Sequence, residues 1–369
     1  MAFYNSFTID SYLDEILHRA IENKRLSKEE GLRLLKSSPA ESFIIANVAN
    51  QITRKKIGQD ITFVINRNIN FTNVCINHCS FCAFRQEMDS SKSYFLSTDQ
   101  VLSKCINAEK LGATEVCIQG GLHPHVELDY YVSLIKLIKE STNLHIHAFS
   151  PMEISYISRS NGISINEVIK ILKDDGLDSI PGTAAEILND DVRKKICPEK
   201  ITSNEWIEII MEAHKSDIPT TSTMLYGHVE STENIIEHLS ILRNIQDQTN
   251  GFSEFVPLSF VHYNAPLYKS NGSRRGSTGI EDLKIISTSR LFLDNFKNIQ
   301  ASWVKFGPKL AQLMLNYGAN DLGGTLMEEK ISRSAGLSFE MITDRDIKDI
   351  IINSGLHPQQ RDTLYNLIN

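Results

Sequence analysis

Short β-rich apolar runs alternate with helix-like segments along most of the chain. The expected strands are residues 61–69, 115–121, 144–151, 178–187, 219–228, 253–262 and 301–307. Between them, Ser97 and Thr98 can cap a helix that runs to Lys110, and Ser164 with Glu167 can cap another that ends at Gly176. Alternation in units of about 30 or more residues indicates a parallel sheet with right-handed crossovers. The pattern predicts an α/β fold built as a (β/α) barrel.

Helical periodicity without strands is found before this region. An apolar face with spacings of three and four residues comprises Leu13, Ile16, Leu17, Ala20 and Ile21. Ser27 and Glu30 then form a capping-box pattern for a second helix that extends through Leu35. We therefore expect an N-terminal helical segment at residues 1–58, the barrel at 59–309, and a C-terminal extension at 310–369 that folds over the barrel.

Three cysteines lie in one short loop after the first expected strand. Cys75, Cys79 and Cys82 have the spacing C-x-x-x-C-x-x-C, and an odd number of neighbouring thiols cannot all pair as disulfides. Thiolates favour zinc or an iron–sulfur cluster. Three local ligands leave one coordination position open, which is typical of a centre that performs chemistry. The loop predicts a cubane cluster with one unprotected iron; the alternative is a zinc site completed by a distant Cys or His.

Other strand ends carry candidate binding residues. Gln119, Gly120 and Gly121 follow the second strand, where glycine lets the backbone approach a ligand closely. Glu186 follows the fourth strand, and Arg193, seven residues later, would share its face on a helix. A surface Glu–Arg pair is the alternative.

Position at strand ends also marks a weaker group of candidates for substrate contact. These are Tyr226, His228, His262 and the neighbouring Tyr263, with Arg274 and Arg275 in a later loop. The histidines at 123, 125, 145 and 147 lack an accompanying carboxylate at a recognisable spacing, so hydrogen bonding in the core or to substrate is expected of them rather than metal binding. For the loop that contains Arg274 and Arg275, the alternative to substrate contact is a solvated basic surface.

Composition narrows the class of protein. The chain has 369 residues, of which 41% are hydrophobic and 22% charged, as in ordinary globular enzymes. The net charge of −7 argues against a nucleic-acid partner, and the longest apolar runs are too short to span a membrane. The N-terminus lacks the basic region of a signal peptide. Cys105, Cys117 and Cys197 are expected to be buried free thiols, which fits a reducing cytoplasm.

The cysteine spacing, with Phe81 just before the third cysteine, resembles the signature of radical S-adenosylmethionine (radical SAM) enzymes. The resemblance implies a partial, six-stranded (β/α) barrel and two cofactors, a [4Fe-4S] cluster and S-adenosylmethionine. It assigns the cluster to Cys75, Cys79 and Cys82. It places the methionine part of S-adenosylmethionine near Gln119–Gly121, and suggests Glu186, Arg193 and Phe81 (with Phe84) as further cofactor contacts.

Further segments are similar to one group of radical SAM enzymes in cofactor biosynthesis. The segments Phe255–Tyr268, Ser273–Thr278 and Glu328–Gly336 resemble the FO synthase subunit 2 (CofH) family, although Ser277 stands where proline is expected. The resemblance implies that L-tyrosine is cleaved and its 4-hydroxybenzyl group joined to 5-amino-6-(D-ribitylamino)uracil. It also implies a functional partner, CofG, and a reductase, ferredoxin or flavodoxin as electron donor. The alternatives are an aminofutalosine synthase-like enzyme of menaquinone synthesis and a non-catalytic iron–sulfur or zinc protein.

Overall fold

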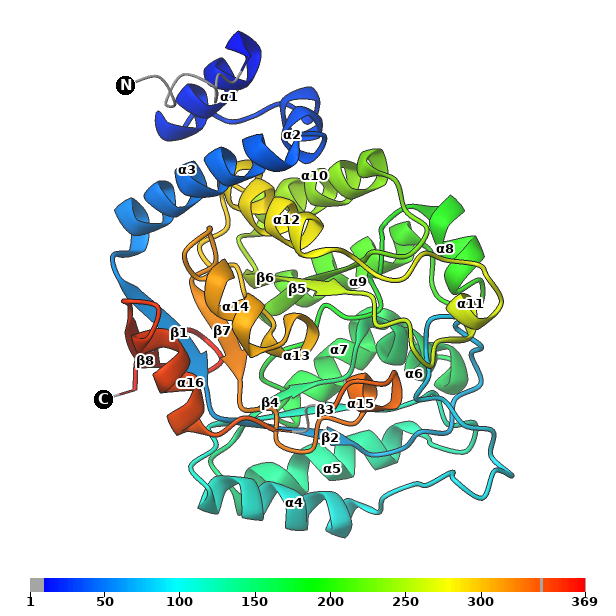
Figure 1. Ribbon diagram of the computed structural model, residues 1–369. Coiled ribbons are helices and arrows are strands. Elements are labelled where there is room, and N and C mark those ends of the chain that lie inside the picture. The colour runs from blue at the N-terminus through cyan, green and yellow to red at the C-terminus, as the bar shows by residue number, and fades with distance from the viewer. Residues whose placement is uncertain (1–9, 339–340, 369) are drawn as a thin grey trace.

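Parallel strands form the centre of the protein, and helices surround them (Figure 1). The computed structural model describes residues 10–338 and 341–368, so the first nine residues of the expected N-terminal segment lie outside it. Three sheets have the strand orders β7-β1-β8, β2-β3-β4 and β5-β6, and all their pairings are parallel. The strands are β1 (Asp60–Val64), β2 (Asn66–Asn70), β3 (Glu115–Gln119), β4 (His145–Ala148), β5 (Thr220–Tyr226), β6 (Phe252–Ser259), β7 (Asp321–Gly324) and β8 (His357–Gln360).

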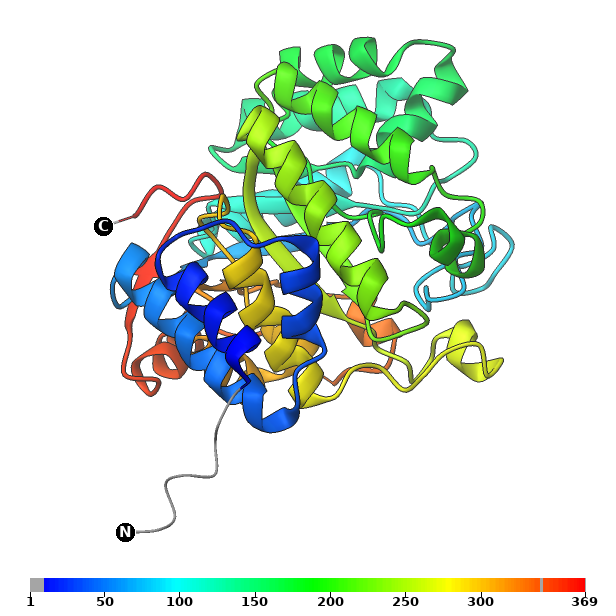
Figure 2. The ribbon, with the colours of Figure 1, turned by 90° about the horizontal axis from the view of Figure 1, so that it is seen from above.

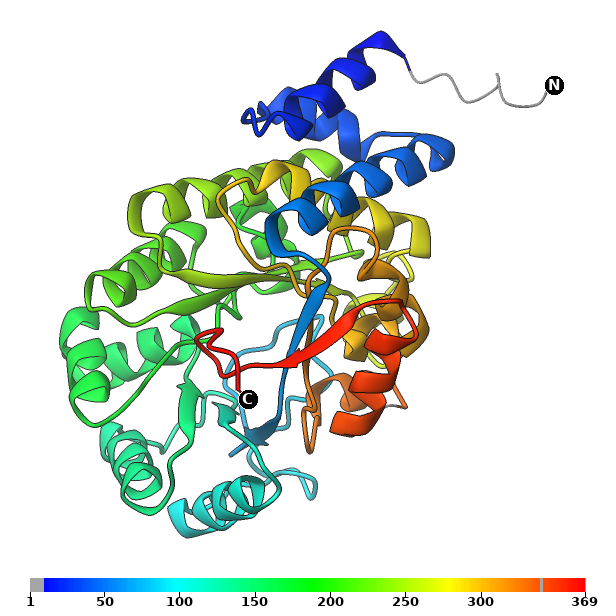
Figure 3. The same ribbon diagram turned by 90° about the vertical axis from the view of Figure 1, so that its left-hand side faces the viewer.

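Single-residue bridges connect these sheets around the barrel. Parallel bridges join His147 to Ser179, Ile180 to Thr220, Phe255 to Ile299, Gln300 to Asp321 and Arg67 to Met327. Seen end-on, the strands surround a common axis and most helices lie outside them (Figure 3). The predicted parallel (β/α) architecture is confirmed. Within the described ranges, however, no single continuous sheet runs around the whole barrel, because 179–180 and 299–300 contribute only isolated bridges.

Two expected strands are wrong in extent. Residues 178–187 form only the bridges at Ser179 and Ile180, because Pro181 lacks an N–H donor and Ala184 and Glu186 have positive φ angles of 72° and 48°. Residues 301–307 are not a strand either. The strand position falls on Ile299 and Gln300, and the chain then turns into the short helix α13 (Trp303–Phe306).

The expected strand at 61–69 is divided at Ile65. Its first half, β1, pairs with β7 and β8, whereas its second half, β2, pairs with β3. Both strands that pair with β1, namely β7 and β8, come from the segment after residue 310. This C-terminal segment therefore contributes strands to the barrel wall in addition to helices.

Amphipathic helices cover the outside of the barrel. Predicted caps are found where expected: Ser97 accepts a hydrogen bond at the start of α4, and Ser164 and Glu167 form a capping box for α7. The barrel helices are α4 (Thr98–Lys110), α5 (Leu128–Ser141), α6 (Pro151–Asn161), α7 (Ile165–Asp174), α8 (Asp190–Ile196), α9 (Ser203–Lys215), α10 (Thr232–Thr249), α11 (Pro266–Lys269) and α12 (Gly279–Phe292). The later helices are α13, α14 (Pro308–Met314), α15 (Ile331–Ser334) and α16 (Asp344–Ile352).

Three N-terminal helices precede the barrel: α1 (Ser11–Ile21), α2 (Lys28–Leu35) and α3 (Pro39–Ile57). The helix α3 packs along α12, and α2 contacts both α10 and α12 (Figure 2). They therefore cover one side of the barrel, away from the cysteine loop. In the part of the chain that is described, no helix combines the length and apolar character that crossing a bilayer requires.

Candidate active site

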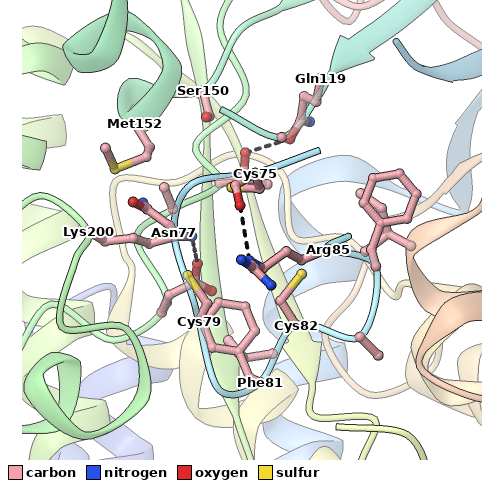
Figure 4. A pocket seen from close by; sticks show the side chains of 18 of the residues that line it. Cys75, Asn77, Cys79, Phe81, Cys82, Arg85, Gln119, Ser150, Met152 and Lys200 are labelled. Carbon is pink, nitrogen blue, oxygen red and sulfur yellow. Dashed lines mark hydrogen bonds and ion pairs between the residues drawn. The ribbon is translucent and has the colours of Figure 1, made fainter. Parts of the chain in front are cut away.

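A cavity of about 250 Å³ opens where the cysteine loop meets the C-terminal ends of the strands. Its wall contains Cys75, Cys79, Cys82 and Phe81 from the loop, as shown in Figure 4. The strand ends and following turns supply Gln119, Gly120, Gly121, Ser150, Glu153, Thr183 and Glu186. We call this the upper cavity. Its position matches the end of a (β/α) barrel at which active sites are built.

Backbone hydrogen bonds hold the cysteine loop on both sides. The N–H of Ile76 donates to the carbonyl of Leu122 at 3.0 Å, and the N–H of Ser80 donates to the carbonyl of Ile196 at 2.8 Å. The Arg85 guanidinium donates to the Cys75 carbonyl at 3.0 Å (Figure 4). A loop fixed in this way presents all three thiols to one cavity without regular secondary structure.

The environment of the thiols fits a bound metal cluster. All three cysteines are free, and burial raises the pKa of Cys75 and raises that of Cys79 to about 12. A thiolate there needs positive charge beside it, and a coordinated metal deprotonates a thiol outright. Backbone groups of Leu122 and Asn77 lower the pKa of Cys75, and Lys200 lowers both pKa values, but burial outweighs these effects.

The arrangement of donors bears on the choice between a cluster and a single ion. Among the described residues, no group of three or more His, Cys, Asp or Glu is arranged to hold one metal ion. A zinc site needs its ligands to meet at one point, whereas the thiolates of an iron–sulfur cluster bind different irons. The arrangement therefore gives no support to the zinc alternative and leaves the cluster assignment to the three loop cysteines as a prediction.

The double glycine at the end of β3 lets this strand contact the cysteine loop. A Cβ on Gly121 would lie 2.2 Å from the Val74 carbonyl oxygen, and one on Gly120 would lie 2.6 Å from the Phe71 ring. Gln119 accepts a hydrogen bond from the Thr183 hydroxyl at 3.0 Å (Figure 4). Glycine is thus required here for packing, and both glycines also line the cavity, as a cofactor role would need.

Glu153 is a site residue that the sequence analysis missed. Its carboxylate accepts hydrogen bonds from the N–H and hydroxyl of Ser150 at 2.7 Å and from the N–H of Gly120 at 3.0 Å. It therefore caps α6 and also fixes the glycine turn. Burial raises its pKa to about 7. The Ser-x-x-Glu pattern at the end of the third expected strand was the available signal, since it is a capping box placed at a strand end.

Glu186 and Arg193, predicted together, are placed apart. Glu186 lines the upper cavity and accepts an ion-pair hydrogen bond from Lys200 at 2.6 Å. Arg193 is 3% exposed and does not line the upper cavity; its guanidinium donates to the carbonyls of Ala184 and Ile201 at 3.1 Å. Lys200, also 5.2 Å from the centre of the Phe81 ring, is the cation that the structure places beside Glu186.

None of the weaker substrate candidates lines the upper cavity. Tyr226 donates to Asp282 at 2.7 Å, and His228 lies 3.1 Å from Glu230, both in the protein interior. Arg274 pairs with Glu230 at 2.9 Å. Arg275 donates to the Tyr268 hydroxyl at 3.0 Å, and the His262 ring packs against Tyr263 and Tyr268. The assignment of these residues to substrate contact stays a prediction.

A second cavity of about 250 Å³ continues along the barrel interior beneath the first, and we call it the lower cavity. Most of the residues that line it have polar side chains, and they include Asn68, His147, Glu254, Gln300 and Arg361. The two cavities share six wall residues: Gln119, Thr183, Thr223, Leu258, Lys305 and Ile331. These six residues form the neck between the cavities. The arrangement offers a cysteine-lined chamber joined to a polar chamber.

Comparison with known proteins first identifies the broad class to which this fold belongs. The structure is similar to methylornithine synthase (PylB), with a TM-score of 0.71, 20% identity, and coverage of 93% of this chain and 97% of that one. It is also similar to HydG, a maturase of the [FeFe]-hydrogenase, with a TM-score of 0.73, 15% identity, and coverage of 96% and 77%. The sequence model of the radical SAM superfamily matches residues 69–242. The fold is that of radical SAM enzymes.

The particular family follows from closer relatives. The model of the CofH/MqnC C-terminal region matches residues 249–369. The 5-amino-6-(D-ribitylamino)uracil–L-tyrosine 4-hydroxyphenyl transferase of Methanocaldococcus jannaschii is 49% identical over 94% of this chain and 98% of its own length. That of Methanococcus vannielii is 49% identical over 95% and 99%. The chain belongs to this transferase family, which confirms the predicted CofH resemblance over its sibling enzymes.

Proposed function

We propose that this protein cleaves L-tyrosine and joins its 4-hydroxybenzyl group to 5-amino-6-(D-ribitylamino)uracil. The observation that carries the proposal is the identity of 49% with transferases of that name over nearly the whole chain. Cleavage of the Cα–Cβ bond of tyrosine leaves the benzylic carbon on the aromatic fragment, and the remaining two-carbon imine hydrolyses to glyoxylate. The product would then pass to a CofG partner in the synthesis of the deazaflavin FO.

The upper cavity contains side chains that would bind the cofactors of this chemistry. Cys75, Cys79 and Cys82 would hold a [4Fe-4S] cluster, and the wall from Gln119 to Gly121 would lie against S-adenosylmethionine. When bound, these cofactors supply a 5′-deoxyadenosyl radical on receipt of one electron from a reductase, ferredoxin or flavodoxin. Glu186 would accept hydrogen bonds from a ribose or ammonium group. The barrel wall would exclude water and hold the reacting groups close together, which is the protein's part in cofactor chemistry.

The two connected cavities support a reaction with two substrates. A neutral benzylic fragment must meet an acceptor that is already held against it, because escape or quenching competes with coupling. The polar lower cavity offers hydrogen-bonding groups for the uracil and ribityl parts of the acceptor, including Asn68 and Gln300. Tyrosine cleavage should therefore become uncoupled or fall when the acceptor is left out.

The test is product analysis on the reconstituted, reduced protein. With ring-labelled tyrosine and the ribitylaminouracil, mass spectrometry should show the label in a hydroxybenzyl adduct. Conversion of a futalosine-type acceptor, with the label left in tyrosine, would replace this proposal by the sibling function.

The same preparation tests the cluster ligands. Cys75→Ala, Cys79→Ala and Cys82→Ala should each lose bound iron and the formation of 5′-deoxyadenosine, because each removes one of three protein ligands. Cys105→Ala is the matched control, since Cys105 is buried on α4 away from the cavity. Iron and sulfide assays measure the outcome, and full iron content in any of the three loop variants would refute the ligand assignment.

A further inference from the structure

Lys305 is an unusual cation in the wall of the two cavities. It is the single charged residue among the six that form the neck. Its side-chain Nζ donates to the Ser332 hydroxyl at 2.7 Å, and its own N–H is fixed on the Ser302 carbonyl at 3.0 Å. The backbone of Lys305 is therefore fixed within α13, and its ammonium group is oriented by Ser332 of α15.

The other cations of the two walls are each paired with a carboxylate. Lys200 lies 2.6 Å from Glu186, Arg85 lies 2.7 Å from Glu87, and Arg361 lies 2.6 Å from Asp321. Within residues 10–338 and 341–368, no carboxylate lies within 4.0 Å of the Lys305 ammonium. Glu329, which acts on Lys305 at longer range, accepts a hydrogen bond from the N–H of Ser332 at 2.9 Å.

Lys305 is half-buried, and a partly desolvated cation with only a hydroxyl partner is costly unless a ligand compensates it. Burial lowers the pKa of Lys305, while Glu329 and Glu186 raise it at longer range and so favour its charged form. The ammonium retains donor capacity, since it carries three protons and one hydrogen bond to Ser332. The site is therefore suited to a negatively charged group in the neck.

Only one of the two proposed substrates carries such a group. L-tyrosine has an α-carboxylate, whereas the ribitylaminouracil offers carbonyls, amines and hydroxyls but no carboxylate. The carboxylate of S-adenosylmethionine is expected at the end of the upper cavity that holds the three loop cysteines, and these three do not line the lower cavity.

We infer that Lys305 binds the α-carboxylate of L-tyrosine in the neck between the cavities. This inference rests on the proposed function. It makes Lys305 the residue that sets the Cα–Cβ bond between the radical source above and the acceptor below. It also predicts selection for amino acids over the corresponding amines.

The test compares L-tyrosine with tyramine, which lacks the carboxylate. Binding of each is measured by equilibrium dialysis on anaerobic reconstituted protein with S-adenosylmethionine, without reductant, so that no turnover occurs. The natural protein should bind tyrosine at least about tenfold more tightly than tyramine. Lys305→Met should weaken tyrosine binding by roughly 10- to 100-fold, the loss typical of a hydrogen bond to a charged group, and should leave tyramine binding unchanged.

Two further variants complete the test. Lys309→Met makes the same change at an exposed position four residues away and should leave both affinities unchanged. Ser332→Ala removes the hydrogen bond that orients the ammonium and should produce a smaller loss for tyrosine alone. Iron content confirms that each variant is folded and loaded.

The outcomes separate this inference from the proposed function. Unchanged tyrosine affinity in Lys305→Met, or an equal loss for tyrosine and tyramine, would overturn the carboxylate role while leaving the tyrosine-dependent function standing. A natural protein that binds neither compound would overturn both.

Discussion

At the residue scale, Glu186 and Arg193 have different surroundings although one pattern suggested both. Glu186 faces the upper cavity beside Lys200, whereas Arg193 donates only to backbone carbonyls that shape the turn after residue 183. A buried guanidinium that satisfies several carbonyls stabilises the local fold, because each unpaired buried carbonyl would carry a desolvation cost. We therefore expect Glu186 to bind the cofactor and Arg193 to hold the backbone in position.

This separation can be measured with two substitutions. Glu186→Gln should weaken S-adenosylmethionine binding by roughly 10- to 150-fold without loss of iron, because a hydrogen bond to a charged group is removed. Arg193→Met should instead lower the free energy of unfolding by about 1–3 kcal/mol for a buried carbonyl left unpaired. Calorimetric titration and denaturant unfolding give the two quantities. Lys194→Met, on the exposed side of the same helix, is the control, and a binding defect confined to Arg193→Met would reverse the assignment.

Sequence reasoning located residues whose chemistry is marked by local spacing. The three cysteines and the Gln119–Gly121 turn line one cavity, as the resemblance implied. Lys200 and Lys305 escaped notice because a lysine carries no local signal of burial, and its neighbour is set by contacts between distant segments. Tyr226 and His228 were suggested by strand-end position, which fixes a residue's height on the barrel but not whether its side chain points inward.

At the scale of elements, helices were more predictable than strands. Capping boxes such as Ser27–Glu30 and Ser164–Glu167 are encoded within four residues, so local sequence defines the start of a helix. The strand positions at 179–180 and 299–300 depend on pairing with neighbours far along the chain, and Pro181 and the positive φ at Ala184 end the first of them. Hydrophobic runs therefore indicated the right regions with the wrong limits.

The packing of α2 on the barrel depends on one glycine. A Cβ on Gly31 would lie 2.4 Å from the end of the Ile236 side chain and 2.8 Å from the Phe292 ring, which belong to α10 and α12. Close approach of the helices at this point therefore requires the absence of a side chain.

We expect Gly31→Leu to lower the free energy of unfolding by about 1–3 kcal/mol, as overpacking of a buried contact does. Gly279→Ala is the matched control, because nothing lies within 4 Å of the added Cβ at the start of α12. Its effect should stay within about 0.5 kcal/mol, as for a surface substitution. Denaturant unfolding of the three proteins measures the difference, and equal stability of the two variants would show that α2 is not held by this contact.

At the scale of the whole molecule, the barrel is closed below by the last residues of the chain. Arg361 donates to Asp321 at 2.6 Å, and Tyr365 donates to Glu254 at 2.7 Å. These contacts join the segment after β8 to β6 and β7, and Figure 3 shows this segment reaching inside the outline of the barrel. The polar lower cavity thus has a floor that comes from the opposite end of the sequence to the cysteine loop.

The charges of this floor do not balance. Asp321 already neutralises Arg361, so Glu254 is an additional buried acid, 7% exposed. Burial, with Asp321 nearby, raises the pKa of Glu254 to about 7, although Arg361 lowers it in part. An acid whose pKa is raised by folding stabilises the folded protein fully below its unfolded pKa, and that contribution is lost as the pH rises through the folded pKa.

The consequence is a loss of stability between pH 4.5, the unfolded pKa of the Glu254 carboxyl, and about 7. In that range the folded protein binds more protons than the unfolded chain, so this group's contribution falls by at most roughly 1.4 kcal/mol for each pH unit.

Glu254→Gln keeps the shape and hydrogen-bonding capacity but cannot ionise. The free energy of unfolding of Glu254→Gln, relative to that of the natural protein, should therefore increase as the pH is raised from 5 to 8. Chemical denaturation of anaerobic, reconstituted samples at four pH values measures this, with the exposed Glu140→Gln on α5 following the natural profile. Parallel pH profiles for Glu254→Gln and the natural protein would mean that Glu254 is already ionised in the fold, held by Arg361 and Tyr365.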